Sequence, residues 1–325
     1  MEEVDDGRPW VEKYRPKTLD DVVGHEKILN TLRAYVKEGN FPHLLFAGPA
    51  GTGKTSTAYA FSSDLLGGRL SKDTLLELNA SDANSIEDMR TIVKEFALQQ
   101  SVLASQHKII ILDEADNISR DAQSALRRIM ESGNMRVRFI ILCNYPNRII
   151  DPILSRCAIF RFPRLPEQFI TQKLEEIADK EGLQLAPDVF PQINYLSRGD
   201  MRQAITLLQV VGEFWEEEQL VGDPLYELSG FLPPSFLETL AGQLQSQTFS
   251  QLRDDVLAAV GGKSSRSVML QLLALVPSLT MDAIKRAKII DEIALCDYYI
   301  TEGATESIQY SGLVAFLAEK LGQAK

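Results

Sequence analysis

The sequence is poor in the residue types that build disulfide frameworks and metal centres. Its 325 residues include three cysteines and three histidines. These are Cys143, Cys157 and Cys296, and His25, His43 and His107. The cysteines are too few and too scattered for a disulfide framework or a zinc site, and the histidines show no metal-ligand spacing. We therefore expect a protein of a reducing compartment in which the histidines are structural or surface residues.

Long apolar runs are also absent. No segment approaches the roughly 20 apolar residues that a membrane-spanning helix needs. The apolar share of 45% and the charged share of 24% are ordinary for a globular protein. The first six residues, Met1 to Asp6, are acidic and contain no apolar core, so they do not resemble a secretory signal. The sequence predicts a cytoplasmic or nuclear protein of two or three domains.

Positive charge is scarce, with 34 Lys and Arg against 45 Asp and Glu and a net charge of −11. A chain this acidic is not expected to bind nucleic acid indiscriminately. Residues 211–325 hold 8 basic and 16 acidic side chains, whereas residues 1–210 hold 26 and 29. Local basic patches in the first two thirds can therefore still face a phosphate backbone, but the acidic final third is a poor surface for DNA.

The most specific motif is Gly48-Pro49-Ala50-Gly51-Thr52-Gly53-Lys54-Thr55, a complete G-x-x-x-x-G-K-[ST] phosphate loop. Apolar residues 44–47 precede it as a predicted strand, and residues 56–66 follow it as a predicted helix. The glycines let backbone N–H groups turn toward phosphates. Lys54 reaches the β- and γ-phosphates, and the Thr55 hydroxyl can ligate Mg²⁺. A chance glycine-rich turn would lack this strand and helix, so the sequence predicts binding of a nucleoside triphosphate.

Five short apolar segments alternate with helical segments between about residues 21 and 162. They are Leu44–Ala47, Leu75–Asn79, Ile109–Asp113, Phe139–Asn144 and Ala158–Phe162. Apolar residues on both faces of a strand are typical of a parallel sheet that helices cover on both sides. With predicted helices at residues 86–100 and 121–131 between the strands, the pattern indicates a doubly wound α/β core.

Only helices are predicted after this core. The segment Phe162 to Pro166 interrupts the pattern, and predicted helices follow at residues 167–181, 187–197 and 200–213. A second break runs from Gly222 to Pro234. After it, apolar periodicity predicts further helices, including residues 268–276 and 283–299. We expect three domains: an α/β nucleotide-binding domain at residues 1–163, a small helical lid at 164–228 and an all-helical C-terminal domain at 229–325.

An acidic pair follows the third predicted strand, where Ile109 to Leu112 lead into Asp113-Glu114. A P-loop ATPase needs acids at this edge of its sheet. Asp113 would hold Mg²⁺, and Glu114 would orient and polarise the attacking water. An acidic strand end before a turn is the alternative, but the phosphate loop upstream favours the catalytic interpretation.

Three further polar residues are candidates for contacts to the γ-phosphate. Asn144 follows the fourth predicted strand, where asparagine is usually a turn former. Arg156 precedes the last strand and Arg202 begins a helix, and most arginines are surface residues. However, γ-phosphate chemistry commonly uses an arginine to neutralise developing charge, and one supplied by a neighbouring subunit would couple hydrolysis to assembly. From the residues alone, both interpretations of these side chains remain open.

The motifs occur in the order found in AAA+ ATPases: phosphate loop, Asp113 to Asp116, Asn144, Ser155-Arg156-Cys157, and Gly199 to Arg202. Four further segments resemble the small subunits of replication factor C, the sliding-clamp loader of archaea and eukaryotes. They are Trp10 to Pro16, Leu78 to Asp82, Ala125 to Arg128, and Cys157 to Phe162. Thr301 to Ala304 is similar to the C-terminal pattern of this family, so the resemblance covers essentially the whole chain. The four-cysteine zinc module of many bacterial loader subunits is missing from the sequence.

The resemblance implies an AAA+ α/β core with a parallel sheet, a helical lid and a C-terminal collar that holds a five-membered ring together. It also implies that ATP and Mg²⁺ are bound, with the adenine near the N-terminal segment. The implied nucleotide-binding residues are Val11, Tyr14, Arg15, Val23, Gly48, Pro49, Ala50, Gly51, Thr52, Gly53, Lys54, Thr55, Ser56, Asn144 and Arg202.

The family pattern further implies a division of roles at the ATP. Glu114 and Lys54 would act within the subunit, with Asn144 as the first sensor and Arg202 as the second. Arg156 would be a finger that reaches the ATP of the adjacent subunit. The metal would be held by Thr55 and Asp113, and Asn79 would restrain Glu114 until DNA arrives.

DNA contacts in this family come from basic residues on core helices. Arg90 and Lys94 are four residues apart on one predicted helix face, where both can meet a phosphate backbone. A solvated helix face is the alternative. The chain departs from the family at Ala83 to Ile86, where an arginine and a glycine are usual, so one DNA contact is expected to be missing or moved. Residues 99–103 lie where a clamp-facing loop is expected.

We therefore predict an ATPase subunit of a clamp loader, which opens the ring-shaped clamp and places it on primer–template DNA during replication. The expected partners are a large loader subunit and further small subunits in a pentameric ring, the sliding clamp and DNA. One alternative is an ATP-binding but non-hydrolysing subunit of the same ring, against which Thr55 and Glu114 argue. The other is a different AAA+ DNA remodeller, such as a branch-migration motor, which the N-terminal and collar segments oppose.

Overall fold

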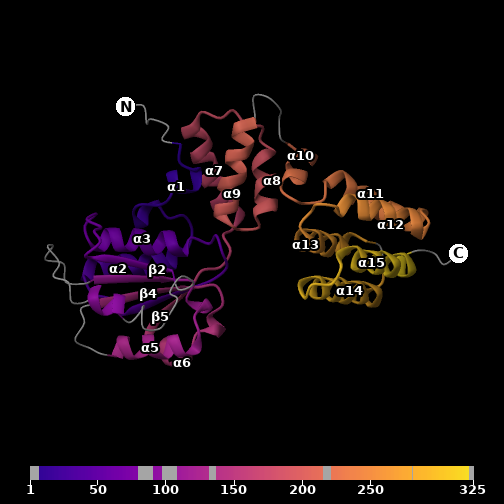
Figure 1. The fold of residues 1–325 in the computed structure, drawn as a ribbon. Coiled ribbons are helices and arrows are strands. Elements are labelled where there is room, and N and C mark those ends of the chain that lie inside the picture. The colour runs from indigo at the N-terminus through magenta and orange to yellow at the C-terminus, as the bar shows by residue number, and fades with distance from the viewer. Residues whose placement is uncertain are drawn as a thin grey trace. The chain divides into compact units, whose positions relative to one another are not determined.

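The computed structural model describes residues 7–79, 91–96, 108–131, 137–214, 221–279 and 281–321. The chain divides into two compact units, one formed by residues 1–185 and 193–209 and the other by residues 186–192 and 210–325. The division passes through helices α8 (Val189–Ser197) and α9 (Met201–Phe214). Figure 1 labels the helices of both units and the strands β2, β4 and β5.

A five-stranded parallel sheet forms the centre of the first unit, with strand order β2-β3-β4-β1-β5. The strands are β1 (His43–Ala47), β2 (Leu75–Asn79), β3 (Lys108–Asp113), β4 (Val137–Cys143) and β5 (Cys157–Arg161). All five lie where the sequence predicts them, with ends shifted by at most two residues. Because β3, β4 and β1 are neighbours, the loops that follow them meet at one edge of the sheet.

Alternate residues of the strands pack into apolar clusters on opposite faces of this sheet. On one face, Phe46 and Ile111 pack in a cluster with residues of α2 (Glu26–Glu38) and α3 (Lys54–Leu65). On the other, Leu45 and Ile110 share a cluster with residues of α5 (Arg120–Glu131) and α6 (Asp151–Leu154) and with the helical residues 91–96. Figure 1 shows α2 and α3 on one side of the sheet and α5 and α6 on the other. The predicted doubly wound core is confirmed.

Helix α3 begins two residues before the helix expected from the sequence. Gly53 has a φ of 90° and serves as the N-cap, so that Lys54 and Thr55 occupy the first turn. The N–H groups of a first helical turn have no partner within the helix and point toward the preceding loop. The phosphate loop is therefore continuous with a helix N-terminus, which is a favourable site for anions.

The sheet is followed by helices α7 (Glu167–Glu181), α8 and α9. The amide of Asn194 in α8 donates to the hydroxyl of Thr171 in α7 at 2.6 Å. A short helix, α1 (Trp10–Lys13), lies against α9, because the backbone N–H of Trp10 donates to Gln209 Oε1 at 2.9 Å. The described residues of the first unit also include the 3-10 turns η1 (Leu19–Asp21), η2 (Ala115–Asn117) and η3 (Pro146–Arg148).

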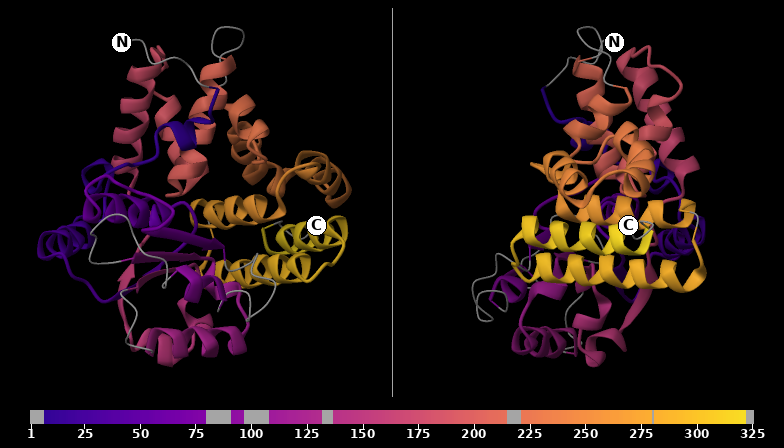
Figure 2. Two further views of the ribbon diagram at one scale, coloured as in Figure 1. Left: turned by 60° about the vertical axis from the view of Figure 1, so that its left-hand side comes forward. Right: turned by 90° about the vertical axis from the view of Figure 1, so that its right-hand side faces the viewer.

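The second unit is helical and has its own core. Its helices are α10 (Asp223–Leu228), α11 (Pro234–Ser246), α12 (Phe249–Val260), α13 (Ser265–Leu275), α14 (Ala283–Thr301) and α15 (Glu306–Leu321), with a turn η4 (Val276–Ser278). Buried residues of α11 to α15 form one apolar cluster. In both views of Figure 2, α15 (yellow) runs along α14. The side-chain amide of buried Gln271 bonds both the N–H and the C=O of Leu232, at 2.8 and 3.0 Å.

One prediction about this region is wrong in part. The break expected from Gly222 to Pro234 contains helix α10. Gly222 takes a φ of 70° as N-cap and Pro224 occupies the first turn, where proline costs no hydrogen bond. Gly222 and Pro224, which predict a loop in the sequence, therefore mark the beginning of a helix. Among the described residues, no helix is long and apolar enough to cross a membrane.

Candidate active site

The phosphate loop follows β1 directly and is held against the neighbouring strands. The N–H of Gly48 donates to Cys143 O of β4 at 3.2 Å. A Cβ atom at Gly48 would lie 2.1 Å from the backbone oxygen of Phe162, so only glycine fits there. Gly51 has a φ of 69°, which other residues rarely adopt. Both glycines are therefore required by the backbone path of the loop.

Lys54 points back along the loop and is only 8% exposed. Its ammonium donates to Gly48 O at 2.7 Å, to Pro49 O at 2.8 Å and to Asn144 Oδ1 at 2.9 Å. Burial lowers the pKa of Lys54, and Asp113 opposes this shift. The ammonium is thus fixed where the loop meets the ends of β1 and β4.

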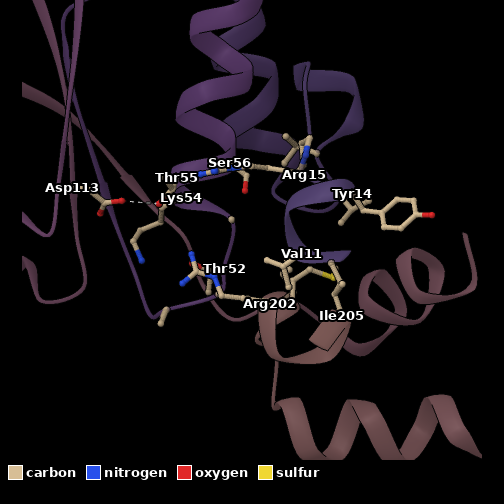
Figure 3. A pocket seen from close by; sticks show the side chains of 18 of the residues that line it. Val11, Tyr14, Arg15, Thr52, Lys54, Thr55, Ser56, Asp113, Arg202 and Ile205 are labelled. Atoms are coloured by element: carbon tan, nitrogen blue, oxygen red, sulfur yellow. Dashed lines mark hydrogen bonds between the residues drawn. The ribbon is translucent and has the colours of Figure 1, made fainter. Parts of the chain in front are cut away.

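Thr55 and Asp113 bring oxygen ligands together from α3 and β3. The Thr55 hydroxyl donates to Asp113 Oδ2 at 3.0 Å (Figure 3). Asp113 Oδ1 accepts the backbone N–H of Glu114 at 2.8 Å. Hydroxyl and carboxylate oxygens beside a phosphate site are the ligands that Mg²⁺ uses together with phosphate oxygens and water. The two residues therefore fit the metal role expected from the sequence.

Glu114 lies directly after β3 in a left-handed backbone conformation, with a φ of 53°. This conformation is uncommon for a non-glycine residue and is found preferentially at functional sites. Its carboxylate accepts a hydrogen bond from Asn117 Nδ2 at 3.2 Å. Glu114 also lines the same cavity as Lys54, Thr55 and Asp113.

Asn144 is held in place by a residue to which the sequence assigns no role of its own. The Asp116 carboxylate is buried and accepts the backbone N–H groups of Asn144, at 3.2 Å from each oxygen, and of Tyr145, at 3.0 Å. A buried carboxylate needs such donors to offset its desolvation. Asp116 therefore fixes the backbone that carries Asn144.

A cavity of about 200 Å³ extends from the phosphate loop toward the N-terminal segment. Its lining includes Val11, Tyr14, Arg15 and Val23, as the resemblance implies for the adenine side. The Arg15 guanidinium lies 4.8 Å from the centre of the Tyr59 ring, a cation–π contact between the N-terminal segment and α3. Of the implied nucleotide-binding residues, Gly48 and Pro49 do not line this cavity.

Figure 3 shows that the cavity is also bordered by the first turns of α9, where the side chains of Arg202 and Ile205 face it. Lys54 and Arg202 point toward the same space, and the charge of Arg202 contributes to the lowered pKa of Lys54, although less than burial does. Sequence reasoning missed Met201, Ile205 and Leu165 as lining residues. The spacing of Ile205 three residues after Arg202 is the only signal for it, because both then lie on one helix face.

Arg156 lies apart from the cavity of its own chain. It follows α6, where its guanidinium donates to Pro152 O at 2.7 Å and forms an ion pair with Glu131 of α5. Its side chain is 36% exposed. Arg156 is therefore accessible at the surface of the described core.

Two other predicted residues, Asn79 and Lys94, are described by the structure. Asn79 ends β2 and is the register partner of Asp113 in β3, which places it beside the acidic pair. Lys94 is exposed on the helical residues 91–96. Arg90 and residues 83–86 and 99–103 lie outside the described residues, so the predicted DNA and clamp segments are only partly described.

His25 is structural, but it contacts the site. Its Nε2 lies 3.0 Å from Thr52 O in the phosphate loop, and its ring packs edge-on against Phe162 at 4.8 Å between centroids. Burial lowers the pKa of His25, so its neutral form is favoured. His25 thus supports the loop from the α2 side.

A phosphate loop after β1, acids after β3 and an asparagine after β4 of one parallel sheet define an AAA-type ATPase. Residues 44–165 match the family described as ATPase family associated with various cellular activities (AAA). Among solved structures, Thermotoga maritima RuvB is similar with a TM-score of 0.55 and 18% identity, over 76% of this chain and 88% of that chain. The RuvB Holliday junction branch migration motor of the same organism also gives 0.55 and 18%, over 80% and 91%. At this identity the likeness concerns the fold.

The second unit and the whole-chain relatives are more specific. Residues 232–316 match the replication factor C C-terminal domain. The replication factor C small subunit of Archaeoglobus fulgidus is 40% identical over 311 residues, which is 95% of this chain and 97% of that protein. That of Halobacterium salinarum is 40% identical over 315 residues, with 95% of each covered. The chain belongs to the replication factor C small subunit family, and the clamp-loader ATPase role and ATP binding predicted from the sequence are confirmed at this level.

Proposed function

We propose that this chain hydrolyses ATP in the cavity between the phosphate loop and α9, and that the hydrolysis drives the loading of a sliding clamp onto primer–template DNA. The observation that carries the proposal is that polar residues far apart in the sequence meet in one cavity. Four separate segments of the sequence supply residues to one cavity: Lys54-Thr55, Asp113-Glu114, Asn144 and Arg202. Phosphoryl transfer needs this kind of positioning and electrostatic stabilisation rather than covalent chemistry.

Within the cavity, each side chain has a distinct task. Lys54 and the N–H groups at the start of α3 hold the phosphates. Glu114 accepts a hydrogen bond from the attacking water and orients it in line with the γ-phosphate. Asn144 and Arg202 contact the γ-phosphate and sense whether it is present. Tyr14, Arg15 and the apolar residues Val11 and Val23 surround the base.

Magnesium fits the oxygen pair of Thr55 and Asp113, which are already joined at 3.0 Å. When bound there with phosphate oxygens, the ion neutralises charge that develops on the phosphates. The chain's own contribution is to hold the two ligands on α3 and β3, next to the phosphate loop.

Arg156 is proposed to act on the ATP of an adjacent subunit. It lies outside the cavity of its own chain and is exposed, as a residue with a target on a neighbour must be. The Glu131 partner holds the guanidinium at the surface until a phosphate replaces it. In this arrangement, hydrolysis requires assembly.

The proposed assembly is a pentameric ring with a large subunit and further small subunits. Residues 1–163 would form the nucleotide-binding domain, 164–228 the lid and 229–325 the collar. Exposed apolar side chains on α14, among them Ile284, Leu295 and Tyr298, support an interface role for the collar. Arg90 and Lys94 are the proposed DNA contacts.

The proposal is tested by measuring ATPase activity of the purified chain with and without primed DNA, clamp and a candidate large subunit. Stimulation that needs the full mixture supports the clamp-loader ATPase. ATP binding without turnover in any mixture would instead support a non-hydrolysing ring subunit. Full activity of the isolated chain would contradict the role of Arg156 on a neighbouring ATP.

A further inference from the structure

A second cavity lies beside the nucleotide cavity within the first unit and has a volume of about 390 Å³. Six of its lining residues are cationic. They are Arg8, Lys13, Arg15, Lys17, Lys173 and Lys180. Only two lining residues, Asp21 and Glu176, carry carboxylates. In a chain with a net charge of −11, this is an unusual concentration of positive charge.

The six cations at this cavity outnumber the carboxylates around them. Arg15 pairs with Glu12 at 3.2 Å, and other carboxylates each bind two groups. Glu176 accepts from the ammonium groups of both Lys173, at 2.9 Å, and Lys180, at 2.6 Å. The Glu181 carboxylate serves Lys13, at 2.7 Å, and also the Tyr14 hydroxyl. Within the described part of the chain, no carboxylate pairs with the ammonium of Lys17.

An excess of like charges in a small space is unfavourable unless an anion joins them. Lys173 is 8% exposed, and its ion-pair partner Glu176 also pairs with Lys180. The nearby Asp21 carboxylate, which interacts with Lys173, also accepts a hydrogen bond from the Thr18 hydroxyl. The lining offers few apolar groups beyond Pro16 and the Tyr14 ring, so an apolar ligand has little to contact. The chemistry of the cavity therefore suits a small, multiply charged anion.

The cavity also has a defined place in the fold. Lys13 to Lys17 come from α1 and the segment after it, whereas Lys173 and Lys180 come from lid helix α7. Tyr14, Arg15 and Pro16 line this cavity as well as the nucleotide cavity. A bound anion would join the N-terminal segment to the lid next to the ATP.

We propose that this second cavity is an anion site that binds an oligophosphate, meaning two or more linked phosphate groups, either free or carried by a nucleotide. Linked phosphates place several negative charges in a small volume. They can accept hydrogen bonds from ammonium and guanidinium groups on opposite walls. Anion binding in the second cavity does not depend on ATP hydrolysis in the nucleotide cavity. The anion site can therefore be tested separately from the proposed function.

The test is calorimetric titration of sodium tripolyphosphate into the full chain, in magnesium-free buffer with ADP at saturation to occupy the phosphate loop. We expect one tripolyphosphate per chain. The double variant Lys17→Ala/Lys180→Ala should weaken it by about tenfold or more, since each removes a charged hydrogen-bond donor. A matched control is Lys27→Ala/Lys37→Ala, which removes two exposed lysines of α2 and should leave the affinity unchanged.

A parallel titration with a non-hydrolysable ATP analogue, without ADP, identifies the source of the phosphates. Two analogues per chain indicate a nucleotide-borne oligophosphate, and one indicates a free oligophosphate. Absence of saturable tripolyphosphate binding would overturn the proposal, as would equal weakening by both double variants. It is also overturned if tripolyphosphate binding is unchanged in Lys17→Ala/Lys180→Ala and only DNA binding is lost. Circular dichroism melting of each variant confirms that it is folded.

Discussion

The ammonium of Lys54 lies 2.9 Å from the side-chain oxygen of Asn144, although the two residues are 90 positions apart. The contact joins the phosphate loop after β1 to the end of β4, its neighbour in the sheet. The Lys54 ammonium and the Asn144 amide, which would both face the γ-phosphate, are therefore already side by side. Asp116, in the turn η2 that follows β3, completes the arrangement by fixing the backbone of Asn144.

The role of Asp116 gives the first prediction. Asp116→Asn should lower ATP turnover by about tenfold, because one oxygen that accepts the N–H groups of Asn144 and Tyr145 is replaced by a donor. ATP affinity should change little, since Lys54 and the loop remain. Steady-state kinetics of the assembled ring measures turnover, and nucleotide titration measures ATP affinity. Asp121→Asn, at an exposed position of α5, is the control; an equal loss in both variants would contradict a positioning role.

Arg156 gives a prediction about assembly. Arg156→Ala should lower turnover in the assembled ring by about 10³-fold, the usual contribution of an arginine that neutralises transition-state charge. Nucleotide binding by the isolated chain should be unchanged, because Arg156 does not line its own cavity. Arg127→Ala is a matched control, since Arg127 also pairs with Glu131, at 2.8 Å. Weakened binding by the isolated Arg156→Ala chain would point to a role in its own site.

The exposed face of residues 91–96 gives a prediction about DNA. Lys94→Ala should weaken DNA-stimulated ATPase activity and reduce the salt dependence of DNA binding by about one counterion, as expected for one lost phosphate contact. Arg90→Ala should behave in the same way. Lys27→Ala on α2 should not. A salt slope that is the same in Lys94→Ala and in the unchanged chain would remove Lys94 from the DNA surface.

His43 makes stability depend on pH. Burial, and to a smaller degree Arg138, lowers the pKa of His43 to about 4, and neutral Nδ1 accepts the N–H of Phe139 at 3.1 Å. As pH falls below about 6.5, the unfolded chain takes up a proton that the folded chain does not. The free energy of unfolding should therefore fall by about 2 kcal/mol between about pH 7.5 and about pH 5.

Denaturant unfolding at the two pH values, followed by circular dichroism, measures this loss. His43→Gln cannot take up the proton and should lose correspondingly less stability on acidification. If the unchanged chain and His43→Gln lose the same stability, other groups cause the pH dependence.

Much of the core could be predicted because its signals are local. Runs such as Ile109 to Leu112 are apolar at every position, and such runs form strands of a covered parallel sheet. The phosphate loop is recognisable because the backbone requires its two motif glycines: a Cβ atom at Gly48 would lie 2.1 Å from Phe162 O, and Gly53 has a φ of 90°. Helix α7 has the predicted bounds, since Pro166 precedes it and Gly182 ends it with a φ of 69°.

Features that depend on tertiary contacts could not be predicted. In the sequence, Asp116 is one of several acidic residues and nothing links it to Asn144. The fold brings the two residues together although they are 28 positions apart. Ile205 and Met201 become lining residues only because the start of α9 contacts the phosphate loop, where Met201 N donates to Gly51 O at 3.0 Å. Gly222 and Pro224 predict an interruption of regular structure, and the preceding helix does end before them. However, they begin helix α10 instead of a loop.

Glu114→Gln tests the central claim most directly. The variant keeps the size of the side chain but removes the carboxylate that orients the attacking water. We predict ATP binding within about twofold of the unchanged chain and turnover in the assembled ring lowered by about 10²–10⁴-fold. Single-turnover hydrolysis and nucleotide titration measure the two quantities on the same preparation. Normal turnover by Glu114→Gln would contradict the assignment of this cavity as the hydrolytic site.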